Sequence, residues 1–340
     1  MSAAHAGFAR RLVDWQRGHG RHDLPWQGTR DPYRVWLSEI MLQQTQVATV
    51  LGYYGRFLAR FPDVHALAAA SLDEVLVQWQ GLGYYSRARN LHRCARVVVE
   101  RHGGAFPASS AELAELPGIG RSTAAAIAAF CFGERVAILD GNVKRVLTRL
   151  LGIDADLALA ANERALWDEA AALLPRTGIE AYTQGLMDLG ATLCRARAPD
   201  CAACPVRSLC AAARAGDPER YPMRTRRGVR TRRESWLLWL HSRGRVWLVQ
   251  RPPRGVWAGL WTPPIFDDEP ALLCAAAALG VAPAAQPPID HALTHFDWRL
   301  HPRRATLPRA GAAPGPGRWV AHADLGAVAL PAPLARLLGG

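Results

Sequence analysis

One acidic side chain interrupts a segment that otherwise predicts a buried surface. Glu39 lies in VWLSEIMLQQTQVATV, a largely apolar stretch at 35–50 with a helical period. The expected core contacts of this stretch are Val35, Trp36, Ile40 and Val47. Because an ionised carboxylate resists burial, a glutamate among such neighbours is a candidate for proton transfer. A glutamate that faces water or forms a salt bridge is the alternative that this segment alone leaves open.

A second acid, Asp140, follows a backbone pattern that suits phosphate. In LPGIG, at 116–120, Gly118 and Gly120 permit a tight turn and a close backbone approach. The Ala-rich run 121–132 then predicts a helix whose first amides point unpaired out of that turn, toward a place for a phosphate oxygen. Asp140 precedes another helical pattern at 142–151, so it falls near a helix start. An N-cap is the structural alternative for an aspartate there.

Four of the seven cysteines have a spacing typical of a cofactor site. Cys194, Cys201, Cys204 and Cys210 form C-x6-C-x2-C-x5-C, so four thiolates on short loops can converge. Zinc sites usually pair one C-x2-C with another or with two histidines, which this stretch lacks. The asymmetric all-cysteine pattern therefore favours a [4Fe–4S] cluster over zinc. Three single cysteines in apolar surroundings are expected in the core: Cys94, Cys131 and Cys274.

Two further stretches carry side chains that can contact bases. Gln43, Gln44 and Gln46 end the predicted helix that holds Glu39, and their amides can bond base edges or cap backbone groups. In GLGYYSRARNL, at 81–91, a glycine turn exposes two tyrosines ahead of two arginines, which suits stacking with phosphate contact. A helix N-terminus with core tyrosines is the alternative.

Composition sets the broad class. The 340 residues are enough for two domains, each with its own core, and the formal charge of +12 favours a polyanionic partner. An arginine-rich composition that comes from a GC-rich genome is the alternative explanation of this charge. No apolar run reaches the 18 residues of a membrane span and no signal-type core follows the N-terminus, so we expect a cytosolic chain without a membrane partner.

The periodicity predicts an all-α first half and a mixed second half. Helices are expected at 6–19, 33–50, 50–60, 71–80, 85–102, 121–132, 142–151, 160–174 and 179–190. The segment 214–233 loses apolar periodicity and reads as a linker between domains at 1–213 and 234–338. Strand-like runs separated by turns follow, with a short helix at 268–280, which indicates an α+β domain.

With these pieces in place, the chain resembles the adenine DNA glycosylases of the MutY type over nearly its whole length. The resemblance lies in SEIMLQQTQVATV, GLGYYSRARNL, LPGIGRSTAAAI, ILDGNVKRV and the cysteine loop at 194–210, in the family's order. It implies a helix-hairpin-helix glycosylase domain of two helical subdomains with a [4Fe–4S] loop, followed by a Nudix-like domain. The implied substrate is double-stranded DNA in which adenine faces 8-oxoguanine or guanine. This DNA is expected to be that of a bacterial nucleoid. A monomer is expected.

The resemblance also assigns chemical roles. Glu39 is expected to protonate adenine N7 and later to help a water attack, while Asp140 stabilises, or transiently bonds, the anomeric carbon, and Asn142 orients these groups. Cleaving an N-glycosidic bond requires an acid near the leaving base and negative charge near the sugar cation. We expect apolar surroundings to raise the pKa of Glu39 from ~4.3 toward neutrality, and Asp140 to stay ionised.

The same resemblance predicts the DNA contacts. Gln44 and Tyr84 take the role of intercalating wedges, which offset the cost of moving a base out of the stack. The hairpin contributes Gly118 and Gly120. Where the family writes Phe–Ser–His in its 8-oxoguanine loop, this chain writes Leu293–Thr294–His295, which keeps a hydroxyl and loses an aromatic ring. Further expected contacts are Thr45, Ser122, Lys144, Thr294 and His295.

Ser122 separates this reading from its closest rival, an endonuclease III-like enzyme that also cleaves the strand. That class carries a nucleophilic lysine two residues after the hairpin's last glycine, and a hydroxyl cannot form the Schiff base that β-elimination requires. We therefore expect a monofunctional glycosylase. Two other rivals are a non-catalytic iron–sulfur DNA-binding or redox protein, which Glu39 and Asp140 argue against, and a Nudix hydrolase. EPALLCAAAALG, at 269–280, lacks that hydrolase's paired glutamates and arginine.

Overall fold

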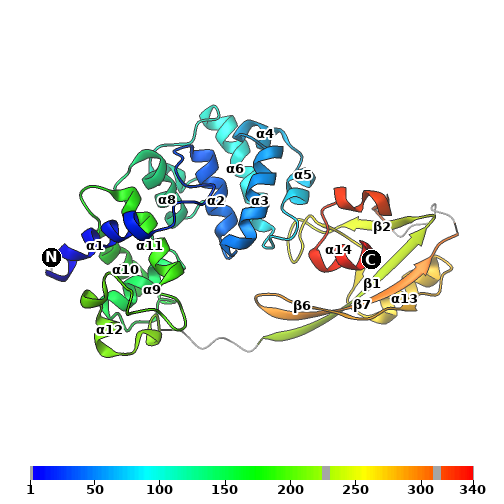
Figure 1. Ribbon diagram of the computed structural model, residues 1–340. Helices are drawn as coiled ribbons and strands as arrows, with labels where there is room; N and C mark the ends of the chain where they lie inside the picture. Colours follow the sequence, from blue (N-terminus) through cyan, green and yellow to red (C-terminus); the bar gives the residue numbers. More distant parts are fainter. Residues whose placement is uncertain (1–2, 224–229, 309–314, 340) are drawn as a thin grey trace. The chain divides into compact units, whose positions relative to one another are not determined.

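The computed structural model describes residues 3–223, 230–308 and 315–339. The chain divides into two compact units (Figure 1). The first contains Met1–Ala68 and Arg93–Arg227, and the second contains Ala69–His92 and Gly228–Gly340. A segment from within the helical half of the sequence therefore belongs to the same compact unit as the C-terminal sheet. The centre of the expected linker, 224–229, lies outside the described residues.

The first unit is helical. Its helices are α1 (Ala3–His19), α2 (Pro32–Leu42), α3 (Val47–Arg60), α4 (Val64–Ala69), α7 (Ser110–Leu113), α8 (Arg121–Phe132), α9 (Gly141–Leu151), α10 (Ala160–Ala172), α11 (Ile179–Thr192) and α12 (Ala211–Ala215), with short 3₁₀ turns η1 (Arg207–Leu209) and η2 (Pro218–Arg220). α6 (Ser86–His102) has its first residues in the second unit. Helices 121–132 and 179–190 were predicted to within two residues, whereas α4 and α7 were missed.

The single helix predicted over 33–50 is wrong. Asp31 caps α2 by accepting a hydrogen bond from the Tyr33 amide at 2.9 Å, and α2 then ends at Leu42. The helix is interrupted at Gln44, whose φ of +57° is incompatible with a right-handed helix. α3 starts after Gln46, which has an extended backbone. Neither Gly nor Pro marks this break, and the apolar period continues across it, so the sequence pattern conceals it.

Two sets of apolar side chains hold the helices together. One cluster joins α1, α8, α9, α10 and α11 through buried residues such as Leu12, Ala125, Val143, Leu166 and Leu186. In the other set, the Trp36 ring lies 5.2 Å from Phe106, and Phe57 lies 4.9 Å from Phe61. Ring contacts of α2 and α3 thus add to the apolar packing of the first cluster.

The second unit is built on a sheet. Among the described residues, its strands are β1 (Thr231–Ser242), β2 (Arg245–Gln250), β3 (Trp261–Thr262), β4 (Ile265–Phe266), β5 (Ala284–Ala285), β6 (Ile289–Ala292), β7 (Phe296–Thr306) and β8 (Arg318–Ala321). The order β3-β2-β1-β7-β5 runs across the sheet, and β1 and β7 pair in parallel from Thr231↔Phe296 to His241↔Thr306. β6 and β7 form an antiparallel hairpin whose tip carries Thr294 and His295.

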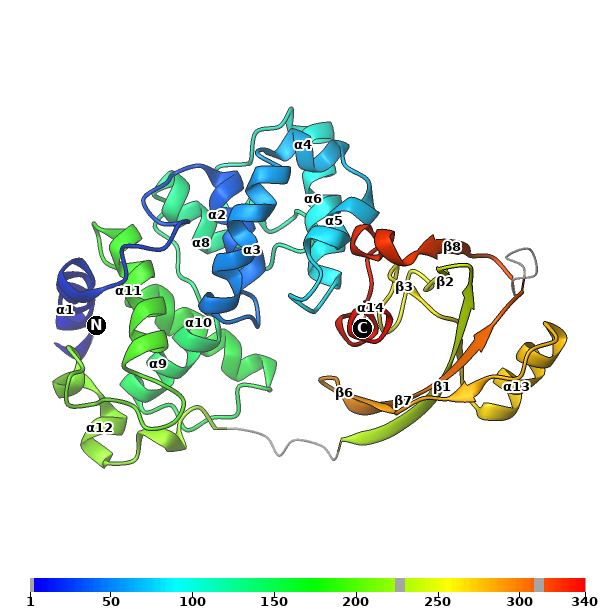
Figure 2. The same ribbon diagram turned by 45° about the vertical axis from the view of Figure 1, so that its right-hand side comes forward.

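Helices cover both faces of this sheet (Figure 2). α13 (Glu269–Ala278) packs Leu272 and Ala276 against Leu238 and Leu240 of β1. The opposite face packs against η3 (His322–Ala327) and α14 (Ala332–Gly339), with Trp239 of β1 in that cluster. Since α13 buries only one side, Cys274 is exposed, and its expected place in the core is wrong. Cys94 and Cys131 are buried as predicted.

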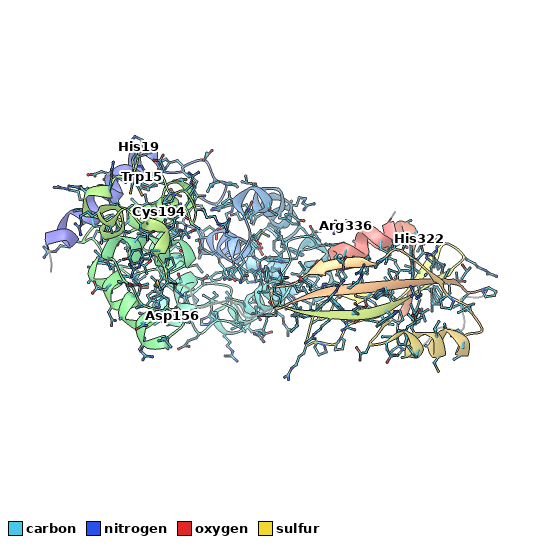
Figure 3. All side chains as sticks on the ribbon, turned by 90° about the horizontal axis from the view of Figure 1, so that it is seen from below. Trp15, His19, Asp156, Cys194, His322 and Arg336 are labelled. Atoms are coloured by element: carbon cyan, nitrogen blue, oxygen red, sulfur yellow. The ribbon has the colours of Figure 1, made fainter. Side chains whose placement is uncertain are left out.

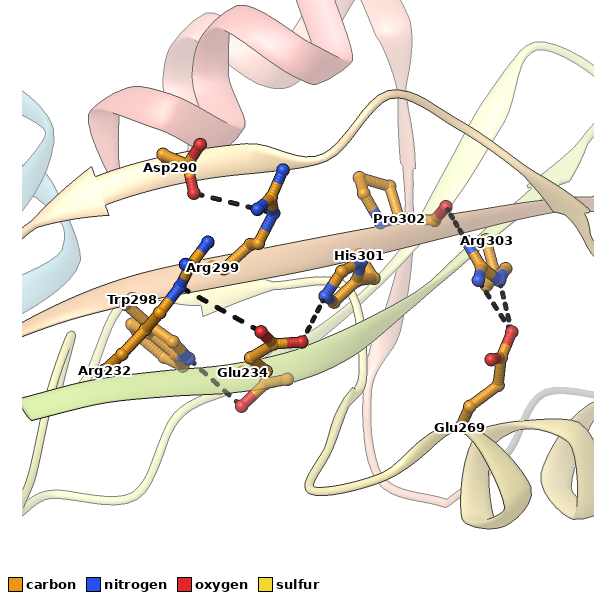
Figure 4. Close-up of polar contacts among 10 residues, drawn as sticks. Arg232, Glu234, Glu269, Asp290, Trp298, Arg299, His301, Pro302 and Arg303 are labelled. Carbon is orange, nitrogen blue, oxygen red and sulfur yellow. Dashed lines mark hydrogen bonds and ion pairs between the residues drawn. The ribbon is translucent and has the colours of Figure 1, made fainter.

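Polar side chains line the part of the β1–β7 pair nearer the start of both strands (Figure 4). The His301 ring stacks on Trp236 at 4.9 Å, and its Nε2 lies 2.9 Å from Glu234. Arg303 forms an ion pair at 2.7 Å with Glu269 on α13. Glu269, the first residue of α13, therefore forms an ion pair with the sheet.

Candidate active site

The first unit contains a cavity of about 440 Å³ with a carboxyl group in its wall. Its lining comes mainly from α2, from the loop 21–30 and from α11, with single residues of α1, α3 and α8. Apolar contributors include Trp26, Leu42, Val47 and Met187, and the polar ones include Glu39 and Gln184. Polar and apolar side chains thus share the lining, and polar groups that converge on a cavity can fix the orientation of a small ligand.

Glu39 has the electrostatics that we expected. It lies on α2 among buried residues, and its carboxyl group is desolvated. Burial raises the pKa of Glu39 from 4.5 to about 8, and Coulombic repulsion from Asp140 adds to the shift. The two carboxylates are thus brought close enough for their charges to interact, although 101 residues of sequence separate them.

Asp140 is both a cap and a charged neighbour of Glu39. It is the N-cap of α9, and its Oδ1 accepts a hydrogen bond from the Val143 amide at 2.7 Å. Burial raises the pKa of Asp140, while hydrogen bonds from the amides of Val143 and Asn142 and the charges of Arg145 and Lys144 lower it. The structural and the chemical interpretations of Asp140 therefore describe one carboxylate, whose ionised form depends on these donors.

Asn142 is held by contacts on two sides. Its Oδ1 accepts from Arg145 Nη2 at 2.7 Å, and the same nitrogen donates to the Gly190 carbonyl at 2.7 Å. A Cβ atom on Gly190 would lie only 2.7 Å from the Asn142 Cβ, so α11 can approach α9 this closely only with glycine there. Arg145 Nε also donates to the Cys194 carbonyl at 2.8 Å.

The hairpin has the predicted form. Gly118 adopts a φ of +80°, the left-handed region that favours glycine, and Gly120 is the N-cap of α8 with no side-chain cap. A Cβ on Gly120 would meet no atom within 4 Å, so the space before the helix is open. Ser122 Oγ accepts from the Leu139 amide at 3.1 Å, which ties the hairpin helix to the residue before Asp140.

Both predicted wedge residues have strained backbones. Gln44 has a φ of +57° and Tyr84 a φ of +47°, a region that residues other than glycine seldom adopt. Gln44 is exposed, and Tyr84 is 46% exposed. Within the second unit, Tyr84 Oη lies 3.3 Å from Thr294 Oγ1 at the tip of the β6–β7 hairpin. Two residues that the sequence placed in separate domains are therefore partners.

The arginines after Tyr84, which the GLGYYSRARNL stretch suggested as phosphate contacts, are engaged within the protein, and their contact with phosphate stays a prediction. Arg87 is buried, lies over the rings of Trp79 and Tyr84, and donates to the carbonyls of Leu82 and Gly83. A guanidinium can satisfy several backbone carbonyls at once, and here it shapes the turn.

The rest of this stretch anchors to the sheet domain. Arg89 donates to the Ala258 carbonyl at 2.7 Å. On α5 (Leu72–Gln78), Asp73 accepts from Trp261 Nε1 at 3.3 Å. These contacts hold the segment 69–92, which carries Tyr84, to the sheet region of the same unit.

The remaining predicted contact residues have varied environments. Lys144 Nζ forms an ion pair with Glu163 at 2.5 Å, so a phosphate contact by this lysine would compete with that partner. Thr45 Oγ1 donates to the Gln43 carbonyl at 3.4 Å. Thr294 and His295 are exposed, and Arg230 holds their hairpin by donating to the Leu293 carbonyl at 2.5 Å. Contact of these residues with DNA stays a prediction.

The four cysteines fit a cluster of several metal atoms. Cys194 follows α11 (Figure 3), Cys210 is the N-cap of α12, and the other two lie on the loop between them. Burial, together with the charges of the three other thiolates, raises the pKa of Cys204 to about 11, which places the four within electrostatic reach of one another. Arg149 Nη1 donates to Cys194 Sγ at 3.3 Å.

No group of three or more His, Cys, Asp or Glu among the described residues is arranged to hold a single metal ion. A [4Fe–4S] cluster binds each thiolate at a different iron and therefore needs a wider cage than one ion does. The four thiolates of one short loop, in the spacing C-x6-C-x2-C-x5-C, are a donor set that fits such a cluster.

Sequence reasoning missed the polar group on the α11 wall of the cavity. Gln184 lines the cavity and donates its Nε2 to Asp188 at 2.8 Å, and Asp188 is fully buried in an ion pair with Arg21 at 2.7 Å. The signal was present, since an aspartate in the apolar helical run 179–190 interrupts a core face as Glu39 does.

Family comparisons agree with both halves of the structure. Residues 37–170 match the family model described as the HhH-GPD superfamily base excision DNA repair protein, and residues 235–339 match the NUDIX domain. The chain resembles the structure of a thermostable thymine-DNA glycosylase, with a TM-score of 0.56 and 29% identity over 62% of this chain and 97% of that one. An endonuclease III–DNA complex, at TM-score 0.51 and 22% identity, shares the fold over 62% of this chain and 97% of that one.

Fold and site together define a base-excision DNA repair glycosylase of the helix-hairpin-helix type with a C-terminal Nudix-like domain. The adenine DNA glycosylase of Buchnera aphidicola (subsp. Acyrthosiphon pisum) is 36% identical over 262 residues, which cover 77% of this chain and 75% of that protein. The Homo sapiens adenine DNA glycosylase is 45% identical over 214 residues, 60% of this chain and 39% of that protein. The chain belongs to the adenine DNA glycosylase family.

In the described residues, no helix combines the length and the apolar composition that crossing a bilayer requires.

Proposed function

We propose that this chain hydrolyses the N-glycosidic bond of adenine mispaired with 8-oxoguanine or guanine in double-stranded DNA, without cleaving the strand. The observation that supports this most directly is the Glu39 carboxyl group, whose pKa is raised to about 8 in the wall of a cavity beside Asp140. We further propose that the protein works as a cytosolic monomer on bacterial nucleoid DNA.

The proton is the first requirement of the chemistry. With a pKa of about 8, the Glu39 carboxyl group is mostly protonated at neutral pH, so it can donate to N7 of a base in the cavity. Protonation converts adenine from a poor anionic leaving group into a neutral one. After the bond breaks, the resulting carboxylate can accept a proton from the attacking water.

The positive charge on the sugar is the second requirement. An oxocarbenium-like cation develops as the base leaves, and a nearby carboxylate stabilises it. Burial raises the pKa of Asp140, and the Val143 and Asn142 amides and the Arg145 guanidinium oppose that rise, so they favour the ionised form that would supply this charge. The sugar carries this positive charge only in the transition state. A carboxylate beside it therefore stabilises the transition state more than the bound substrate.

DNA must be held and opened before either group can act. The amides at the start of α8, beyond the open space at Gly120, suit a phosphate oxygen. The exposed Gln44 and Tyr84 side chains, on strained backbones, suit insertion into the stack when adenine is extruded. Thr294 and His295 supply a hydroxyl and an imidazole for reading the opposite 8-oxoguanine.

Ser122 supports the monofunctional assignment. Its hydroxyl is engaged with the Leu139 amide, and it stands where the endonuclease III class carries its nucleophilic lysine. No Schiff base can form at an oxygen, so the abasic sugar is left intact.

Cys194, Cys201, Cys204 and Cys210 would hold the [4Fe–4S] cluster, which supplies a covalent cross-link of the loop after α11. Arg145 of α9 donates to the Cys194 carbonyl, and Arg149 of the same helix donates to Cys194 Sγ and to the carbonyls of Arg195 and Ala196. The chain's own arginines thus connect the cysteine loop to the helix that Asp140 caps.

A glycosylase assay with separate readouts tests the proposal. Purified protein is incubated with duplexes that carry adenine opposite 8-oxoguanine, adenine opposite guanine, thymine glycol, or only normal pairs. Abasic sites are measured after alkali and nicks without it. We expect abasic sites in both adenine mispairs, few nicks and no borohydride-trapped adduct. Nicking without alkali, or release of thymine glycol in preference to adenine, would reject the proposal.

A further inference from the structure

We infer that Trp257 is a positioning residue for mismatch recognition, because it fixes the hairpin that carries Thr294 and the turn that carries Tyr84 relative to each other. This inference rests on the proposed function and deepens it, since it names the part of the second unit that sets the spacing of the two elements proposed to read DNA. Trp257 lies in the loop 251–260 between β2 and β3 and is 7% exposed.

The backbone of Trp257 is strained. Its φ is +58°, a left-handed conformation that residues other than glycine seldom adopt. The Leu260 amide donates to the Trp257 carbonyl at 2.9 Å, which closes a turn around this residue. A bulky residue keeps such a conformation only where its surroundings fix it, and strain of this kind often marks a functional constraint. The two proposed wedge residues, Gln44 and Tyr84, share it.

One side of the loop packs on the base of the β6–β7 hairpin. The centroid of the Trp257 ring lies 4.7 Å from that of Trp298 and 5.5 Å from that of His291. His291 and Trp298 are directly opposite each other in the pairing of the two strands, and Thr294 follows His291 by three residues. Because the ring contacts both strands of the hairpin just before its tip, it fixes the orientation of the hairpin relative to the loop.

The other side of the loop binds the segment 69–92. The carbonyl of Ala258, the residue after Trp257, accepts from Arg89 Nη1 at 2.7 Å. The direction of this carbonyl depends on the backbone angles of the turn at Trp257. Arg89 and Tyr84 lie five residues apart in the same segment, so the turn that carries Tyr84 is connected to the loop through this hydrogen bond.

A second set of contacts holds the two ends of the loop. Gln250, the residue before the loop, donates its Nε2 to Asp73 Oδ1 of α5 at 3.4 Å and to the Gly259 carbonyl at 3.1 Å. Trp261, the residue after the loop, donates its Nε1 to Asp73 Oδ2 at 3.3 Å. One carboxylate of the segment 69–92 thus binds both ends of the loop whose centre supports the hairpin.

The loop therefore lies between the two elements that are proposed to read DNA. The Tyr84 hydroxyl lies 3.3 Å from Thr294 Oγ1, and one hydrogen bond between exposed side chains contributes too little to hold two elements in register. Recognition groups act well only when they are held to within about 0.5 Å, which requires packed support from the residues behind them. Trp257 supplies that support from the buried side of both elements.

The test measures binding selectivity, the Kd for a normal duplex divided by the Kd for the same duplex with adenine opposite 8-oxoguanine, at one fixed salt concentration. The mispaired adenosine carries a 2′-fluoro group, which destabilises the sugar cation and prevents excision during the measurement. Phosphate contacts supply general affinity and base contacts supply selectivity, so loss of positioning lowers the selectivity and leaves binding to normal duplex nearly unchanged.

Trp257→Leu removes the ring, and Trp247→Leu is the matched control. Trp247 is also 7% exposed in the same unit, but it packs in the cluster of α13 and against Trp319. We expect the selectivity to fall about tenfold for Trp257→Leu and to stay within twofold of wild type for Trp247→Leu. Trp257→Phe keeps an aromatic ring and should recover most of the selectivity. Equal losses in the two leucine variants would mean general destabilisation and overturn the positioning role.

Arg89→Met tests the other side of the loop, because it keeps an unbranched side chain and removes the donor to Ala258. Its selectivity should fall about fivefold, which keeps the test decisive if Trp257→Leu does not fold. In a Tyr84→Ala chain, Trp257→Leu should lower the selectivity much less, since the side chain whose spacing it sets is absent. Wild-type selectivity in Arg89→Met, or an equal loss with and without Tyr84, overturns the inference.

Excision of adenine from the unmodified mispair tests the proposed function separately, and the binding selectivity can be measured whether or not excision occurs. A chain that excises adenine but keeps its selectivity in Trp257→Leu retains the proposed function and loses this inference. A wild-type chain that neither excises adenine nor prefers the mispair loses both.

Discussion

Tyr84 Oη lies 3.3 Å from Thr294 Oγ1, which joins a turn from the helical half of the sequence to the tip of the β6–β7 hairpin. The segment Ala69–His92 belongs to the same compact unit as the C-terminal sheet, and Arg89 and Asp73 bind it there. The residue proposed to enter the DNA stack is therefore positioned by the domain proposed to read 8-oxoguanine.

This contact predicts coupling between Tyr84 and Thr294 in mismatch recognition. Tyr84→Phe and Thr294→Val each remove one hydroxyl, and the double variant should lose less than the sum of the two. A hydrogen bond of this kind is worth about 0.5–1.5 kcal/mol. Dissociation constants for adenine:8-oxoguanine and for normal duplex measure the cycle. Strictly additive losses would show that the two hydroxyls do not interact in mismatch recognition.

Tyr84→Ala should weaken mismatch binding more than binding to normal duplex, and equal losses would make Tyr84 merely structural.

Glu39→Gln should abolish adenine release while leaving binding to mismatched DNA intact, because an amide cannot donate the required proton. The wild-type single-turnover rate should hold below pH 8 and decline as the pH rises through about 8, where the carboxyl group loses its proton. Rates from pH 5 to 10, with binding measured in parallel, test this. A variant that retains near-normal release would refute the role of Glu39.

The same substitution should raise stability at alkaline pH. The pKa of Glu39 is about 8 in the native state and ~4.3 in the unfolded chain, so between these values the native state binds the extra proton. Wild-type stability therefore falls as pH rises through this window, and Glu39→Gln escapes that loss. We expect the variant to be more stable by about 5 kcal/mol at pH 9 and little changed at pH 4, as denaturant unfolding would show. Equal pH dependence in both proteins would contradict the shifted pKa.

Ser122→Ala should lower stability and slow the chemical step together. The substitution leaves the Leu139 amide without its acceptor, at a cost of about 1–3 kcal/mol, one residue before Asp140. Unfolding and single-turnover measurements check both effects. If adenine release and stability both stay at wild-type levels, the hydroxyl does not position the Asp140 segment.

Gly190→Ala should disturb the site from a distance. Its Cβ would lie 2.7 Å from the Asn142 Cβ, and relieving this overlap must shift α9 or α11, at about 1–3 kcal/mol. Gly55→Ala on α3 is the control, because its Cβ would meet nothing within 4 Å and alanine favours a helix. We expect a lower melting temperature and slower base release for Gly190→Ala only. Matching behaviour of the two variants would show that the contact is not tight.

Cys204→Ser should remove the visible absorption of a [4Fe–4S] cluster and lower the iron and sulfide content, because one of four thiolate ligands is lost. Cys274→Ser is the matched control, since that cysteine is exposed on α13 and distant in sequence from the loop. Stoichiometric zinc in place of iron and sulfide in the wild-type protein would overturn the assignment.

The sequence by itself determined the chemistry-bearing residues and the type of each half. Glu39 and Asp140, the glycine hairpin and the four cysteines were recognisable because burial of charge, helix termination and thiolate spacing are local properties. Helix periodicity located α8 and α11, and turn-separated strands indicated the α+β domain. The resemblance to the adenine DNA glycosylases rested on the same local motifs.

Only the tertiary structure decided which of these residues meet. The apolar period concealed the break at Gln44, because a positive φ is a backbone state that no residue pattern encodes without glycine. The ion pair of Arg21 with Asp188 joins residues 167 apart, and the contact of Tyr84 with Thr294 joins residues 210 apart. Such pairs depend on how helices and strands pack, and packing is a property of the whole chain rather than of any segment.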